Sequence, residues 1–162
     1  MQRECYRFGG VTFAIEANAP IERSAMCAPF HAADGAAEHT IRLHFDDRLP
    51  VPPETAQHRG AVWRWQSDTE RHLLEQYGAP GKPPQFTYAV TCGAHTEVTF
   101  ANAYRAGASV RAVLEAAGIF DIFAARGMLV LHCAYIVTRA GEAILFSGPS
   151  GVGKSTQAAL WE

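Results

Sequence analysis

The feature that most constrains how this chain folds is a short segment that begins with glycine and ends with two hydroxyl residues. The segment reads Gly148-Pro149-Ser150-Gly151-Val152-Gly153-Lys154-Ser155-Thr156 and fits the pattern G-x-x-x-x-G-K-[ST] at every fixed position. Such a segment forms a phosphate-binding loop when a strand leads into it and a helix follows it. The apolar run 143–146 precedes the motif, and residues 154–161 are expected to be helical. The sequence therefore predicts a strand, a phosphate-binding loop and a helix, in that order.

The residue types of the motif match the needs of a nucleoside triphosphate. Gly148, Gly151 and Gly153 let the backbone curl so that successive N–H groups point inward at the phosphates. Lys154 supplies a mobile positive charge for the β- and γ-phosphates, and Ser155 offers a hydroxyl to the accompanying Mg²⁺. We therefore expect the whole segment 148–156 to bind the nucleotide and Ser155 to contact the metal.

Composition narrows the classes of protein to which this chain can belong. Apolar residues make up 48% and charged residues 19% of the sequence, which is typical of a globular protein. A net charge of −2 gives no reason to expect nucleic acid or an anionic membrane as a partner. The N-terminus lacks the apolar core of a signal peptide, no run approaches a membrane span, and the cysteines are scattered. These features predict a cytoplasmic location and reduced thiols.

The first hundred residues are expected to form strands and turns. Two short apolar runs flank Gly9-Gly10, which predicts a tight hairpin. In the run 40–45, Ile41, Leu43 and Phe45 alternate with polar residues, so His44 is expected to face solvent. Further expected elements are strands at 62–65, 86–91 and 96–100, a short helix over 68–77, and loops at 49–53 and 81–84.

After residue 105 the hydrophobic period changes to that of helices. Ser109 is a suitable N-cap for a helix over 110–117, and a second helix is expected over 119–125. Two dense apolar runs follow, 128–137 and 143–146, separated by a turn at Gly141. Their density predicts strands that are buried on both faces.

The last third of the chain resembles the HPr kinase/phosphorylase superfamily. The resemblance covers about residues 125–162 and rests on the run 129–137 with His132, the turn, the run 143–147 and the loop 148–156. It implies ATP and Mg²⁺ as cofactors and phosphorylation of a serine or threonine in a protein or peptide. It also implies that His132 lies close to the reacting phosphate. In HPr kinases a glycine follows this histidine and the second loop position is acidic, where this chain has Cys133 and Pro149.

The motif and the resemblance together predict the domain organisation and fold class. We expect a β-rich N-terminal domain over 1–105, a short helical connector over 106–127 and an incomplete P-loop domain over 128–162. The fold class is then α+β in the N-terminal, β-rich region, followed by the start of an α/β P-loop kinase domain of the PEP-carboxykinase-like type.

Phosphoryl transfer also needs carboxylates that hold Mg²⁺ and orient the nucleophile. In phosphate-loop folds these residues usually come from a later strand, so the chain is expected to be catalytically incomplete as given. Asp46, Asp47 and Asp121 could serve only in an unusual topology. Two alternatives remain open. The loop could belong to the ATP-binding subunit of an ABC-type transporter, or the β-rich region could make the protein a binding module that recognises a partner by edge-strand pairing.

Overall fold

The computed structural model describes residues 1–33, 35–77 and 85–161 of the chain. The described residues form two compact units, Met1–Ile119 and Phe120–Glu162. The division falls at the start of helix α2 (Ile119–Ala125), between the boundaries at 105 and 127 that the sequence suggested. The loop expected at 81–84 lies outside the described residues.

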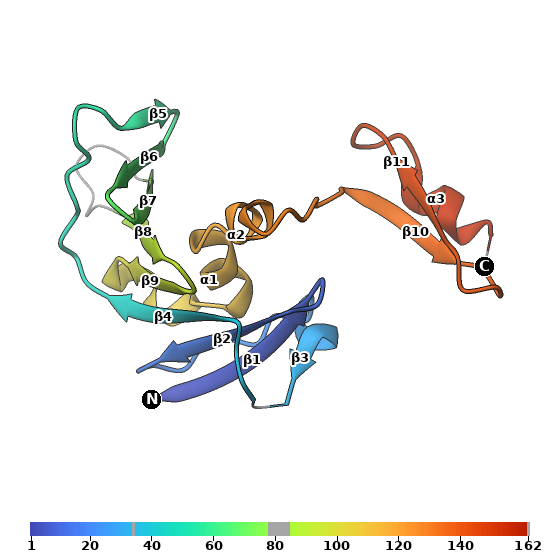
Figure 1. Ribbon diagram of the computed structural model, residues 1–162, viewed down its shortest axis with the longest axis horizontal. Helices are drawn as coiled ribbons and strands as arrows, with labels where there is room; N and C mark the ends of the chain where they lie inside the picture. The colour runs from blue at the N-terminus through green and yellow to red at the C-terminus, as the bar shows by residue number, and fades with distance from the viewer. Residues whose placement is uncertain (34, 78–84, 162) are drawn as a thin grey trace. The chain divides into compact units, whose positions relative to one another are not determined.

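The first unit is built on one mixed sheet, which we call the large sheet and which has nine strands within the described residues (Figure 1). Its order is β3-β1-β2-β4-β9-β8-β7-β6-β5, and β4 pairs parallel with both β2 and β9. The other neighbouring pairs are antiparallel. The strands are β1 (Gln2–Phe8), β2 (Val11–Ala17), β3 (His31–Ala32), β4 (His39–Phe45), β5 (Gln57–Arg59), β6 (Val62–Ser67), β7 (Glu70–Tyr77), β8 (Gln85–Cys92) and β9 (His95–Phe100).

The hairpin expected at the N-terminus is confirmed. Phe8 pairs with Val11, so Gly9 and Gly10 form a two-residue turn between β1 and β2. Their φ angles are +55° and +86°, which glycine adopts without a steric penalty. This is the chemistry that a tight turn between twisted strands requires, and it explains why two successive glycines are a reliable signal for it.

The short helix expected over 68–77 is wrong, because residues 70–77 form strand β7 and residues 68–69 form the turn before it. The strand pairs with β6 on one side and with β8 on the other. Leu74 is fully buried, opposite both Trp63 of β6 and Tyr88 of β8. Ladders on both sides satisfy the backbone groups that a helix would otherwise satisfy, so tertiary pairing overrides the local helical pattern.

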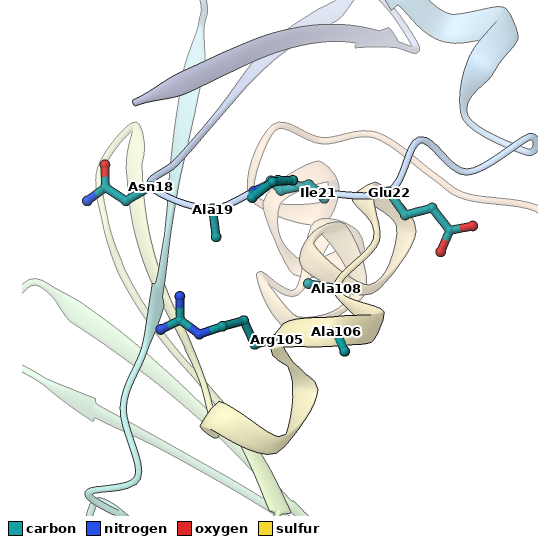
Figure 2. Close-up of a pocket in the computed structure, with 8 residues that line it drawn as sticks. Asn18, Ala19, Ile21, Glu22, Arg105, Ala106 and Ala108 are labelled. Carbon is teal, nitrogen blue, oxygen red and sulfur yellow. The ribbon is translucent and has the colours of Figure 1, made fainter.

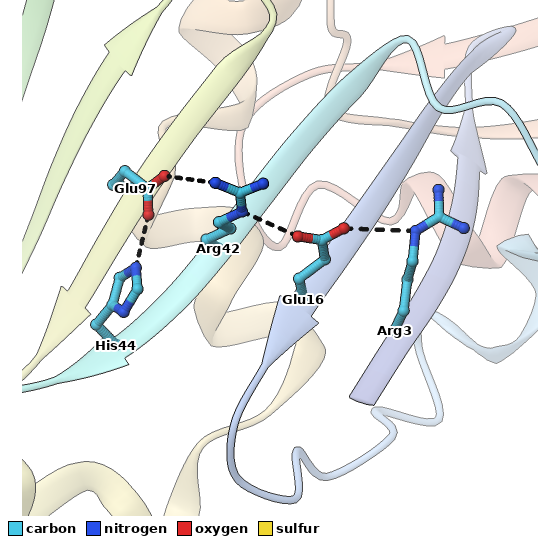
Figure 3. Close-up of polar contacts among 5 residues, drawn as sticks. All are labelled: Arg3, Glu16, Arg42, His44 and Glu97. Atoms are coloured by element: carbon cyan, nitrogen blue, oxygen red, sulfur yellow. Dashed lines mark hydrogen bonds and ion pairs between the residues drawn. The ribbon is translucent and has the colours of Figure 1, made fainter. Parts of the chain in front are cut away.

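One face of the large sheet is polar where β1, β2, β4 and β9 lie side by side (Figure 3). Arg3 and Arg42 approach the two carboxylate oxygens of Glu16, with N–O distances of 3.6 and 2.9 Å. Glu97 continues the row, 3.7 Å from Arg42 and 2.6 Å from Nε2 of His44. His44 is exposed, as expected. Exposed ion pairs of this kind add about 0–1 kcal/mol each to the stability of the fold. Their charged groups make this face of the sheet polar.

The opposite face of these strands carries the core of the first unit. Phe13, Ile15, Ile41 and Leu43 are at most 2% exposed. Toward β6 the buried apolar side chains lie on the other face of the sheet. The register places Leu74 and Phe86 on the face that carries Glu97. Leu74, Phe86 and Ala101 form a second buried cluster, and partly buried side chains pack against it: Leu49, Trp63, Trp65, Tyr88 and Tyr104.

A buried carboxylate ties the start of β1 to the segment after β2. Glu4 is 8% exposed and accepts hydrogen bonds from Tyr6 at 2.6 Å, Gln2 at 2.9 Å and Arg23 at 3.0 Å. Burial alone would raise the pKa of Glu4, but the bonds from Tyr6, Arg23 and Gln2 outweigh it and hold the pKa below its usual value. The hydroxyl of Tyr6 in turn has a raised pKa, because of burial and its bond to Glu4.

This arrangement leads us to expect an acid-sensitive contribution to stability. A carboxyl whose pKa is lowered by folding stabilises the fold above its unfolded value of about 4.3, and this stabilisation is lost as pH falls through the folded pKa. Glu4→Gln should therefore lower the thermal midpoint at neutral pH and show a smaller further fall in acid than the wild-type protein. Glu115→Gln is the matched control, since Glu115 is exposed and forms an ion pair with the exposed Arg111. Equal acid slopes for wild type and Glu4→Gln would contradict this assignment.

Helix α1 (Val110–Ala116) follows the 3-10 helix η2 (Asn102–Gly107) and contacts β8. The expected N-cap is confirmed, because Oγ of Ser109 accepts from the amide N of Ala112 at 3.2 Å. The buried residues of α1 are apolar: Val110, Val113, Leu114 and Ala116. Gly118, with φ of +68°, ends the helix as the sequence suggested.

The second unit holds α2, strands β10 (Cys133–Val137) and β11 (Ala143–Ser147), and helix α3 (Lys154–Ala159). The two strands form an antiparallel hairpin, which we call the loop hairpin, with Gly141 in its turn at φ of +82°. The expected strand over 128–137 is shorter than predicted, because residues 128–132 lie outside β10.

The fold class expected from the sequence is wrong. The described chain is mostly β and is dominated by the large mixed sheet, rather than a β-rich region followed by an α/β P-loop kinase domain. An α/β domain needs parallel strands joined by crossovers of a dozen or more residues. Only residues 138–142 join β10 to β11, so these strands can pair only in the antiparallel sense. The density of apolar residues predicted the strands but carried no information about their direction.

Candidate phosphate-binding site

The predicted order of strand, loop and helix is present around the glycine-rich motif. Strand β11 ends at Ser147, the segment 148–153 is irregular, and α3 begins at Lys154. α3 contacts both strands of the loop hairpin. Ala134, Ile136 and Phe146 share one face of the hairpin and are half-buried, so α3 covers this face and anchors the far end of the loop.

The glycines of the loop occupy conformations that other residues adopt with strain. Gly151 has φ of +80° and Gly153 has φ of +89°, both in the left-handed region. Gly148 differs, because a Cβ there would lie 3.1 Å from Cγ1 of Val152, so the exposed Val152 side chain would have to shift. The loop therefore favours glycine at positions 151 and 153 for its backbone angles.

Lys154 spans the inside of the loop. Its Nζ donates to the carbonyl oxygens of Gly148 and Pro149, each at 3.0 Å. The ammonium group therefore lies at the start of the loop although Lys154 is the first residue of the helix. Both acceptors are neutral carbonyls, and the charge of Lys154 has no carboxylate partner among the described residues. An anion bound at the loop would lie close to this positive charge.

The loop also offers N–H and hydroxyl groups. Among the described residues, no backbone hydrogen bond is donated by the amide N–H of Gly151, Gly153, Lys154 or Ser155. The side chains of Ser150, Ser155 and Thr156 are exposed, and Val152 is 61% exposed. A run of free amides beside a cation and a hydroxyl is the donor set that a polyphosphate with Mg²⁺ requires.

His132 lies at the same end of the loop hairpin as the motif. Cys133 pairs with Ser147, the last residue of β11, so His132 and Gly148 both follow directly from the last pair of the ladder. It precedes β10 rather than lying within the strand as expected, and it is exposed. The fold therefore brings the sequence-predicted histidine to the end of the hairpin where the loop begins, although fifteen residues separate it from Gly148 along the chain.

The carboxylates considered from the sequence have other roles in the fold. Asp46 forms an ion pair with Arg48, and Asp47 accepts from the backbone and side chain of Asn102. These hydrogen bonds, from Arg48 and from Asn102, lower the pKa of the two carboxyls. Asp121 belongs to the first turn of α2. Across the described residues, no group of three or more His, Cys, Asp or Glu side chains could hold a metal ion.

Comparisons with models of protein families, with curated proteins and with solved structures gave no match. The features of this chain that bear on its function are therefore the residues of the loop, His132 and their geometry. Within the part of the chain that the structure describes, no helix has both the length and the apolar character needed to cross a membrane.

Sequence reasoning missed a second group of residues, which lies in the first unit. An open hollow of about 630 Å³ is lined by the segment 18–22, after β2, and by Arg105, Ala106 and Ala108, before α1 (Figure 2). The two segments are joined by backbone hydrogen bonds from Glu22 to Ala108 and from Val110 to Glu22, at 2.8 and 3.0 Å. No motif marks either segment, because the hollow exists only where the fold joins them.

Proposed function

We propose that residues 148–156 bind the phosphates of ATP together with Mg²⁺, and that the protein takes part in phosphoryl transfer of the kinase type. The observation that carries this proposal is the position of the Lys154 ammonium, which lies across a glycine-rich loop. Among the described residues, this ammonium has no carboxylate partner, and several amides of the loop donate no backbone hydrogen bond. A lysine ammonium in this position can bind the phosphates of a polyphosphate.

Each group of the loop has a separate role in this proposal. The amides of Gly151, Gly153, Lys154 and Ser155 donate to phosphate oxygens, while Nζ of Lys154 leaves its two carbonyl acceptors and moves to the β- and γ-phosphates. The hydroxyl of Ser155 serves as a ligand to Mg²⁺, which when bound neutralises charge on the phosphates. Pro149, Ser150, Val152 and Thr156 complete the loop around the nucleotide.

His132 is placed to act on the terminal phosphate. It precedes Cys133 at the end of the loop hairpin where the loop begins, and its side chain is exposed. An imidazole N–H can donate to a phosphoryl oxygen and so orient it. We assign His132 the orientation of the γ-phosphate.

The reaction class rests on the resemblance to the HPr kinase/phosphorylase superfamily. The acceptor in this proposal is a serine or threonine of a protein or peptide, and the location is the cytoplasm. The described cysteines are all free thiols, which agrees with a reducing compartment: Cys5, Cys27, Cys92 and Cys133.

Calorimetric titration with ATP, in the presence and absence of Mg²⁺, tests the binding proposal. We expect saturable binding of ATP that is tighter with Mg²⁺, and we expect Ser155→Ala to lose most of this Mg²⁺ dependence while it still binds the free nucleotide. AMP should bind far more weakly, because it lacks the phosphates that the loop contacts. Equal binding of AMP and ATP would contradict the proposed site.

Transfer of label from γ-labelled ATP to a library of serine- and threonine-containing peptides tests the reaction class. Phosphoserine or phosphothreonine in the products would support a kinase, and His132→Gln should then reduce the rate more than it weakens ATP binding. Release of inorganic phosphate with no labelled peptide would instead indicate an ATPase, and would favour the transporter-type alternative.

A further inference from the structure

The hollow in the first unit combines an oriented cation with a small-residue lining, and it lies outside the proposed nucleotide site. Arg105 lines one end together with Asn18, and Glu22 lines the other end (Figure 2). The remaining lining residues are apolar and mostly small: Ala19, Pro20, Ile21, Ala106 and Ala108. A volume of about 630 Å³ is within the range of small-molecule sites.

The guanidinium of Arg105 is held in place by two neighbours. Its Cζ lies 4.5 Å from the centre of the Phe45 ring, and its Nη2 donates to Oδ1 of Asn102 at 3.3 Å. Asn102 is itself fixed by Asp47, through bonds of 2.8 and 3.0 Å. An arginine stacked on an aromatic ring keeps its planar fork oriented and loses little entropy when it binds a ligand.

The charge of Arg105 is not neutralised within the fold. No carboxylate forms an ion pair with it among the described residues, since Asp47 contacts Asn102 instead. Most of the five N–H donors of the guanidinium therefore remain available. An oriented, uncompensated arginine that lines a hollow is suited to bind a planar anion through two parallel hydrogen bonds.

We propose that this hollow binds a small organic monocarboxylate with a short apolar chain. The carboxylate pairs with Arg105, and the apolar chain lies along Ile21, Ala106 and Ala108. Arg105 sets the orientation, because it is the one cation among the lining residues and lies at one end of the hollow. A monoanion is favoured over a phosphate dianion, because the single arginine that lines the hollow balances one negative charge.

Small side chains are the reason why the hollow exists. Ala19, Ala106 and Ala108 leave space between the two segments, while the backbone bonds between Glu22, Ala108 and Val110 hold the segments together. A larger residue at position 19 would fill the space without changing Arg105. Substitution of Ala19 therefore tests the shape of the hollow, and substitution of Arg105 tests its charge.

Titration with hexanoate, followed by two-dimensional ¹H–¹⁵N NMR, tests the proposal. A Lys154→Ala background keeps the nucleotide loop out of the measurement. We expect saturable shifts of the amide signals of Ile21, Ala106 and Ala108, with affinity in the millimolar range. Hexanamide has the same apolar chain without the charge and should bind at least about tenfold more weakly. Inorganic phosphate should not compete with hexanoate.

Two variants separate charge from shape. Arg105→Gln should weaken hexanoate binding at least about tenfold, and Ala19→Leu should abolish it while the spectrum away from the hollow is unchanged. Arg111→Gln is the matched control, because Arg111 is exposed and forms an ion pair with Glu115 away from the hollow. If Arg105→Gln unfolds, hexanoate binding is measured with Arg105→Lys instead, because lysine keeps the charge but lacks the planar guanidinium. Equal binding of hexanoate and hexanamide, or unchanged binding by Arg105→Gln, would overturn the proposal.

Discussion

Lys154→Ala is expected to weaken ATP binding about 100-fold, which is the largest effect on function that we expect from a single substitution. Nζ of Lys154 lies 3.0 Å from two carbonyls of the loop, where it can move to the phosphates of a bound nucleotide. Hydrogen bonds from a charged donor contribute about 1.5–3 kcal/mol, and this residue supplies the charge for two phosphates. Calorimetric titration with ATP and Mg²⁺ measures the loss.

Arg139→Ala is the matched control for this measurement. Arg139 is an exposed cation in the turn of the loop hairpin, at the end away from the motif. Its removal lowers the net charge by the same amount but leaves the loop intact, so ATP binding should change less than about threefold. Lys154→Ala and Arg139→Ala with equal losses would show that ATP is attracted by overall charge rather than bound by the loop.

Phe13→Ala is expected to destabilise the first unit by about 3–5 kcal/mol, which is the largest effect on stability. The Phe13 side chain is fully buried on β2, opposite Tyr6, and its ring centre lies 5.7 Å from that of His39. Removal of the ring leaves a cavity between β1, β2 and β4 that the surrounding strands cannot close, because their ladders fix their spacing. Urea unfolding followed by circular dichroism measures the change in midpoint.

Phe120→Ala applies the same change of side chain to an exposed position. Phe120 lies on α2 with 61% of its surface exposed, so the expected loss is within about 0.5 kcal/mol. If Phe13→Ala leaves too little folded protein for a urea titration, Phe13→Leu, which leaves a smaller cavity, should still unfold at a lower urea concentration than the wild type. A midpoint for Phe13→Leu equal to that of Phe120→Ala would contradict the placement of Phe13 in the core.

Local chemistry in the sequence was sufficient to predict several elements. Two glycines with positive φ make the β1–β2 turn, and the hydroxyl of Ser109 caps α1. The alternation of Ile41 and Leu43 with Arg42 and His44 correctly separates the buried face of β4 from its exposed face. Each of these features depends on a few neighbouring residues, so the physics that determines them is present in the sequence itself.

Long-range pairing decided the elements that the sequence did not predict. Residues 70–77 have apolar side chains at helical spacing, but β6 and β8 lie on either side of them and enforce a strand. The dense apolar runs before the motif form an antiparallel hairpin, and Tyr135 and Leu145 on its open face are 63% and 51% exposed instead of buried. Strand direction and neighbours depend on the whole chain, which a local pattern does not encode.

The two candidate sites differ in how much of each could be predicted from the sequence. Every residue of the loop 148–156 could be selected from the sequence, because glycine backbone angles and the chemistry of lysine and serine are properties of single residues. The pairing of Cys133 with Ser147 decided that His132 lies beside this loop. The hollow around Arg105 could not be predicted at all, since it forms only where backbone bonds join residues 22 and 108. The donor groups of the candidate phosphate loop follow from its residue types alone. The distant residues that lie together follow from the tertiary structure, because hydrogen-bonded strand pairing brings together residues that are far apart in the chain.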